Sequence, residues 1–287
     1  MIASEFGATR GRSRGDMAEH RNESTGRSAD MDHEVSALQR FARITGFLYL
    51  VIAVFGMFAP TVLQTLVLPG DAATTAHNIV DSRWLFGSSL VTWIALVLAD
   101  AAVAVTLYLL LEPVSRVLSL VAAAFRLLYA AIVGAALLNL FDAFLLLTST
   151  ERAAGLETQQ RQALALSSLA TFGTGFLLAL VFFGVHLLVL GFVLDRSRYV
   201  PRLLSFLLLG GGAGYIVHSL ANFFLADQGG PASAVVLAPA LVGELGLTAW
   251  LLVKGVNVRL EPDTGTSFSA RPAATESASV VATGGAR

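Results

Sequence analysis

Four ionisable side chains lie within stretches of this sequence that are otherwise apolar: Asp100, Arg126, His186 and Glu244. An ionised group at the centre of a bilayer costs about 2.5 to 3.5 kcal/mol on insertion scales, so it faces protein or trapped water rather than lipid. We therefore expect these side chains to find partners on one another's helices. Groups of this kind inside a membrane are also the ones that bind or relay protons, ions and polar solutes.

Depth along the helices places the four side chains in one layer. Counted from the helix ends on one side of the membrane, at 1.5 Å per residue, all four lie about 12 to 17 Å deep. Asp100 and Arg126 belong to apolar stretches joined by a short link, so they are the expected ion pair. Glu244 is then either a second partner of Arg126 or protonated. Two interpretations stay open: the charges only fix helix register, or they form an ion, proton or solute site.

A second polar set is predicted in the outer half of the membrane. Its members are Asn139, Asp142, Tyr215, His218 and Asn222. The last three follow Gly211 at helical spacing and share one helix face. One interpretation is helix packing, with Gly210 and Gly214 as a small-residue contact and with hydrogen bonds between helices. The other is a cavity lining shared with Asn139 and Asp142.

Catalytic and cofactor signatures are missing. The chain has no cysteine, which excludes disulfides and thiolate metal sites. It has no G-x-S-x-G, H-E-x-x-H or P-loop motif, and its GGGAG run lies inside an apolar stretch. His186 and His218 are about 12 and 22 Å from the same membrane face, so they do not face one haem iron. We expect no catalytic residue, metal or cofactor, and the balance is against an enzyme.

The elements that carry these residues are predicted to be membrane helices. Of 287 residues, 55% are hydrophobic and 14% charged, with a mean hydropathy of +0.70, which is typical of a polytopic membrane protein. Six apolar stretches are long enough to span a bilayer: 44–66, 86–111, 118–147, 169–194, 203–225 and 235–253. The predicted fold is an all-α, polytopic transmembrane helix bundle. A net charge of -1 and the lack of a recognition motif argue against nucleic-acid binding.

Domain organisation and orientation follow from the charges outside the spans. Residues 1–40 and 257–287 are predicted to be disordered cytoplasmic tails flanking a transmembrane domain over 41–256. Basic residues near the span ends on one side are Arg40, Arg43, Arg116, Arg196, Arg198, Arg202, Lys254 and Arg259. Those on the other side are Arg83, Arg152 and Arg161. The positive-inside rule then makes both termini cytoplasmic. The excess of arginine over lysine suggests a bacterial protein, and hence the inner membrane; nothing specifies an oligomeric state.

Several segments occur in one order along the membrane region: ARITGFLYL at 42–50, PGDAATTAHNI at 69–79, LLLEPVSR at 109–116, FRLLYAAI at 125–132, GVHLLVLGFVLDRSRYVPR at 184–202 and GELGLTAWLLVKG at 243–255. Together they resemble a bacterial membrane-protein family known as domain of unknown function 4386. The resemblance covers roughly residues 40–256. It implies a multi-spanning membrane protein without an established activity and supplies no catalytic residues.

The leading functional hypothesis is an integral membrane protein with a small-solute, ion or proton site within its bundle, transporter-like or sensory. Six spans permit a three-plus-three inverted repeat, but the two halves of the sequence do not visibly match, which weakens the transporter form. The alternative is a non-catalytic structural or assembly protein of the bilayer. An intramembrane enzyme is a third and weaker hypothesis.

Overall fold

The fold is helical throughout the described part of the chain. A computed structural model describes residues 5–152, 154–225 and 231–256. The helices are α1 (Glu5–Leu66), α2 (Ala72–Asp81), α3 (Arg83–Leu111), α4 (Arg116–Thr148), α5 (Thr158–Ser197), α6 (Arg202–Phe224) and α7 (Pro231–Val253). All but α2 are long and apolar enough to cross a membrane. The predicted all-α bundle with six spans is confirmed.

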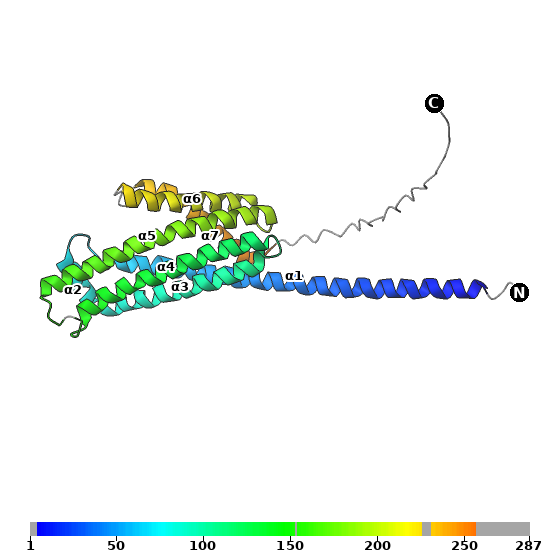
Figure 1. The fold of residues 1–287 in the computed structure, drawn as a ribbon, viewed down its shortest axis with the longest axis horizontal. Helices are drawn as coiled ribbons and strands as arrows, with labels where there is room; N and C mark the ends of the chain where they lie inside the picture. The colour runs from blue at the N-terminus through cyan, green and yellow to red at the C-terminus, as the bar shows by residue number, and fades with distance from the viewer. Residues whose placement is uncertain (1–4, 153, 226–230, 257–287) are drawn as a thin grey trace, which may run out of the picture.

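The six long helices form a closed ring. In the order α1, α3, α4, α5, α6, α7, each contacts the next, and α7 contacts α1 again (Figure 1). The ring closes where α1 and α7 meet: the side-chain amide of Gln39 donates to the Val256 carbonyl at 2.6 Å and accepts from its N–H at 3.4 Å. The two ends of the membrane domain therefore lie on the same side of the bundle, as an even number of spans requires.

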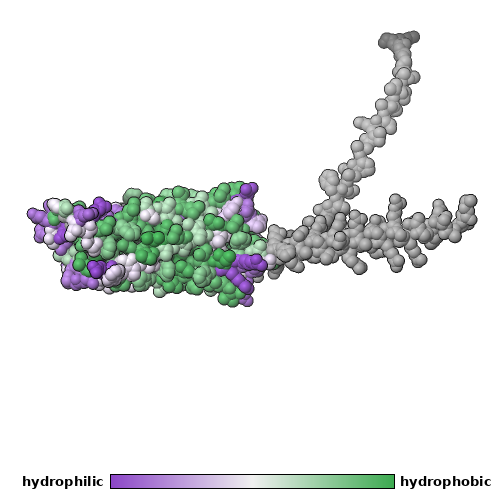
Figure 2. Space-filling view, turned by 90° about the horizontal axis from the view of Figure 1, so that it is seen from below, coloured by the Kyte–Doolittle hydropathy of each residue, from purple (hydrophilic) through white to green (hydrophobic). Residues whose placement is uncertain are grey.

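The surface of the bundle has the distribution that a bilayer requires. Figure 2 shows an apolar band around the middle of the molecule, with hydrophilic residues concentrated at its two ends. Large apolar side chains such as Met57, Val91 and Val235 are 67–75% exposed in this band. Exposure of this extent on a helix bundle indicates contact with lipid.

Short polar caps end and restart the helices between spans. Ser115 caps α4 directly after the Pro113 link, which makes the predicted tight α3–α4 hairpin. Asp71 caps α2 and accepts the Thr74 N–H at 2.9 Å and the Thr74 hydroxyl at 2.7 Å. These bonds hold the pKa of the exposed Asp71 carboxyl below its usual range.

Helix α5 begins at Thr158, well before the apolar stretch that starts at Leu169. The Gln160 side chain accepts the Glu157 N–H at 3.0 Å, which satisfies one of the free donors at the helix start. The helix that begins at Thr158 therefore continues without a break into the predicted fourth span. At 40 residues, α5 is much longer than α6, which has 23.

The structure describes most of the predicted N-terminal tail. Disorder was predicted over residues 1–40, but the structure continues helix α1 back to Glu5, along a segment that no proline interrupts before Pro60. In Figure 1 this part of α1 extends beyond the bundle. Its placement outside the membrane stays a prediction. The tail predicted over residues 257–287 lies outside the described residues.

Candidate functional site

The centre of the bundle is built around Arg126 of α4, whose side chain is fully buried. Its Nη2 donates to Asp100 Oδ1 of α3 at 2.5 Å, so the predicted ion pair is confirmed. Asp100 is 4% exposed. A pair buried this deeply is stable only when the remaining donors and lone pairs are also satisfied.

Two further helices supply partners for the guanidinium. Arg126 Nη1 donates to the Tyr49 hydroxyl of α1 at 2.8 Å and contacts His186 Nε2 of α5 at 3.2 Å. His186 Nδ1 lies 2.8 Å from the Ala122 carbonyl oxygen. Since a carbonyl only accepts and an arginine only donates, Nδ1 carries the proton and Nε2 accepts. These contacts assign a neutral imidazole to His186.

Aromatic rings complete the surroundings of Arg126. The guanidinium carbon lies 4.7 Å from the ring centre of Tyr49 and 5.3 Å from that of Phe183. Tyr49 and Phe183 are functional neighbours that the sequence analysis missed. A tyrosine in the middle of an apolar first span was the available signal, whereas nothing distinguishes Phe183 from other phenylalanines in α5. We call Tyr49, Asp100, Arg126 and His186 the buried quartet.

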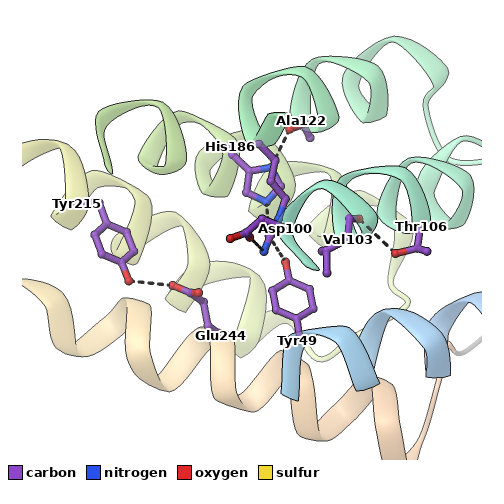
Figure 3. A network of polar contacts seen from close by, with 9 residues as sticks. Tyr49, Asp100, Val103, Thr106, Ala122, His186, Tyr215 and Glu244 are labelled. Carbon is purple, nitrogen blue, oxygen red and sulfur yellow. Dashed lines mark hydrogen bonds and ion pairs between the residues drawn. The ribbon is translucent and has the colours of Figure 1, made fainter. Parts of the chain in front are cut away.

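Glu244 stands apart from this quartet. Its Oε1 accepts the Tyr215 hydroxyl of α6 at 3.1 Å, and the residue is only half-buried on α7. Within the described residues no ion pair joins Glu244 to a cation, so it is not the second partner of Arg126. Figure 3 shows Tyr49 and His186 turned toward Asp100, with Glu244 and Tyr215 to one side. Phe183 connects the two groups, since its ring also packs edge-on against Tyr215 at 5.4 Å.

The members of the predicted outer polar set have different partners in the structure. Asp142 accepts from Ser168 at 3.0 Å and pairs with Arg152 at 3.5 Å, near the C-terminal end of α4. Asn139 donates to the Ala136 carbonyl of its own helix at 3.1 Å. Asn222 lines a groove whose wall includes neither of these two residues. The shared-cavity interpretation therefore stays a prediction, because helical spacing groups residues on a face without specifying which helix that face meets.

The three members of that set on α6 have two kinds of partner. Asn222 donates to the His218 carbonyl at 2.8 Å, and its Nδ2 lies 3.4 Å from His218 Nδ1. Tyr215 turns inward to Glu244. In the described part of the chain, no group of three or more acidic, histidine or cysteine side chains is placed to hold a metal ion.

Comparison with known proteins agrees with the resemblance in sequence. Residues 44–255 match the family described as domain of unknown function (DUF4386). A protein of Archaeoglobus fulgidus titled "Uncharacterized protein" is 31% identical over 167 residues, which cover 58% of this chain and 83% of that protein. No solved structure matches the chain.

Proposed function

We propose, from the premise that this chain belongs to the DUF4386 family and forms a six-span membrane bundle, that it binds a proton or a small cation at Glu244. The buried quartet is the fixed scaffold of this site. One observation carries the proposal: Asp100 and Arg126 neutralise each other, whereas Glu244 has a hydroxyl as its hydrogen-bond partner and no cation in the described residues. A protein of this kind is transporter-like or a sensor.

The groups around Glu244 leave its charge unmatched. Tyr215 of α6 donates a hydrogen bond, and the charges of Arg126 and Asp100 act on the carboxyl through space with opposite signs. Tyr49 of α1 and Tyr129 of α4 also lie within electrostatic range and are neutral when protonated. Because an ionised carboxylate is unfavourable in apolar surroundings, binding a proton or a cation stabilises this site.

Proton binding at Glu244 would act on the contact between α6 and α7. The ionised carboxylate only accepts hydrogen bonds, whereas the carboxylic acid also carries a donor. The Tyr215–Glu244 bond joins these two helices, so a change in protonation alters a bond between neighbouring spans. That coupling is what a transporter-like or sensory membrane protein needs.

A non-catalytic structural role is the competing candidate, and a separate observation favours it. The buried quartet joins α1, α3, α4 and α5, and Arg126 is wholly inaccessible. Such a cluster fixes the register of four helices without binding a ligand. The two candidates differ in what they predict for Glu244.

Replacing Glu244 by glutamine is expected to leave the melting temperature in detergent unchanged or higher, because glutamine keeps the shape of the side chain and removes an unmatched charge. The wild type should shift its melting temperature with pH between about 5 and 9 or with added sodium or potassium, by roughly 2–4 °C for each kcal/mol of binding. Glu244→Gln should lose that response.

The matched control is Glu112→Gln, which neutralises a carboxylate at the exposed end of α3, where it pairs with Arg116 at 3.5 Å. This variant should keep the wild-type response to pH and cations. The structural role is the better account if the wild-type melting temperature responds to neither pH nor cations and Glu244→Gln lowers it as much as a substitution in the core does.

We further propose that the protein lies in the bacterial inner membrane with both ends of its membrane domain in the cytoplasm. The distribution of arginine supports this orientation. Reporter fusions at Glu112 and Arg198 should give a cytoplasmic signal, and fusions near Asn78 and Glu157 should give an external one. A cytoplasmic signal at Glu157 would reverse the orientation.

A further inference from the structure

A groove opens in the outer half of the bundle because the helices there differ in length. Helix α5 extends past the end of α6, as Figure 1 shows, so its outer part lacks α6 as a neighbour. The groove that results has a volume of about 830 Å³, and its wall includes Gln64 of α1, Trp93 of α3 and Phe176 of α5. This volume is in the range of sites that bind small organic molecules.

The groove has the chemistry of a site for an uncharged lipophilic molecule. Among the described residues that line it, none is an aspartate, glutamate, lysine or arginine, and most are aliphatic or aromatic. Its amide side chains are Gln64 and Asn222. A mostly apolar wall with a few placed polar groups is the usual composition of a ligand site. The described part of this lining offers no counter-charge to a charged lipid headgroup.

Trp93 gives the groove a specific polar requirement. The residue is 3% exposed, and its indole Nε1 has no hydrogen-bond partner within the described residues. A buried donor without an acceptor is unfavourable, so nearly all such groups in proteins are paired. Trp93 lines the groove, so an acceptor oxygen of a bound molecule reaches this closed-off donor after a rotation of the indole ring.

Aromatic rings beside Trp93 favour a flat molecule. Its ring lies edge-on to Phe172 at 5.1 Å and to Phe176 at 5.4 Å, and these two phenylalanines are stacked at 6.2 Å. All three rings belong to the lining of the groove. Aromatic walls pack well against another flat ring, in stacked or edge-on arrangements.

We propose that this groove binds an isoprenoid quinone, a neutral membrane lipid with a flat ring, carbonyl acceptors and a long apolar chain. The ring packs against Trp93, Phe172 and Phe176, with the indole N–H donating to a ring carbonyl. The chain leaves between α1 and α5 into the bilayer. This site is separate from Glu244, so failure of one proposal does not affect the other.

The test uses the fluorescence of Trp93 in the full-length chain. The sequence has only two other tryptophans, Trp84 and Trp250, so Trp84→Phe/Trp250→Phe leaves Trp93 as the sole indole. The protein is placed in phosphatidylcholine nanodiscs and titrated with decyl-benzoquinone. We expect saturable quenching at one quinone per protein. Quenching that rises linearly with total quinone, without saturation, would overturn the proposal.

Filling the groove tests where the quinone binds. Gly173 lines it, and a Cβ at this position meets nothing within 4 Å, so Gly173→Leu adds bulk without a clash at the backbone. We expect the apparent affinity to fall at least about tenfold. Gly56→Leu on α1 is the matched control, with equally open surroundings outside the groove, and should bind as the parent does. Equal affinity in both variants contradicts the site.

Two additional measurements complete the test. Ala170→Leu changes another exposed lining residue and should lower the quinone affinity in the same way. It replaces Gly173→Leu in the test if the melting temperature shows that Gly173→Leu is not folded. Nanodiscs of phosphatidylcholine with brominated acyl chains identify a phospholipid occupant. If these chains quench Trp93 strongly, and added decyl-benzoquinone does not relieve that quenching, the groove holds a phospholipid. This result would overturn the quinone proposal.

Discussion

Replacing Arg126 by glutamine is expected to lower the free energy of unfolding by about 3–5 kcal/mol, one of the two largest effects predicted for any single substitution in this chain. The loss has two sources. Asp100 is left as an unpaired charge in a buried position, and the Tyr49 hydroxyl and His186 Nε2 lose the guanidinium that donates to them. Denaturant unfolding in detergent, followed by helical circular dichroism, measures the change.

The double variant Asp100→Asn/Arg126→Gln separates the ion pair from the rest of the quartet. Each single substitution leaves one uncompensated charge, whereas the double substitution leaves none, so it should cost less than the sum of the singles. Arg83→Gln is the control, since this arginine at the start of α3 is exposed and contacts the exposed Trp84 ring. It should change stability by less than about 0.5 kcal/mol. Strict additivity of Asp100→Asn and Arg126→Gln would reject the pair.

The Asp100–Arg126 contact was predictable because two simple quantities specify it. Residue counts from the helix ends give the depth of each side chain, and the short link at Pro113 makes α3 and α4 neighbours. The sequence does not give the rotation of a helix about its axis. That is why the same reasoning grouped Glu244 with Arg126 by depth, although the structure turns Glu244 toward Tyr215.

The spans were predictable from the sequence, whereas the groove was not. Apolar length identifies each membrane crossing, and all six appear where the hydropathy places them. The helix ends depend on local caps such as Gln160, whose hydrogen bond to Glu157 lets α5 begin before its apolar stretch. The groove beside Trp93 follows from the difference in length between α5 and α6, and hence from those caps and from how the helices pack. Hydropathy specifies neither the helix caps nor the packing of the helices.

Substitution of Gly211 by alanine is the second large effect that we predict. In an ordinary helix, glycine to alanine is favourable by roughly 0.8–1 kcal/mol. At Gly211, however, the added Cβ would lie 2.5 Å from Ala240 Cα and 2.8 Å from its N, so the α7 backbone must move away from α6. Overpacking of this kind costs about 1–3 kcal/mol or more, and we expect Gly211→Ala to lower the melting temperature.

The neighbouring glycine gives a control with the opposite sign. A Cβ at Gly210 meets Pro239 Cβ at 3.6 Å, an ordinary van der Waals contact, so Gly210→Ala should leave the melting temperature unchanged or raise it. Gly211 and the expected Gly214, rather than Gly210, are therefore the small residues that let α6 approach α7, since a Cβ at Gly214 would clash with the Val236 carbonyl oxygen of α7. Because Tyr215 lies one turn further along α6, separation of these helices also lengthens its bond to Glu244. Gly211→Ala should thus weaken any response of the melting temperature to pH or cations. If Gly210→Ala and Gly211→Ala change the melting temperature equally, the close α6–α7 contact on which that response depends is contradicted.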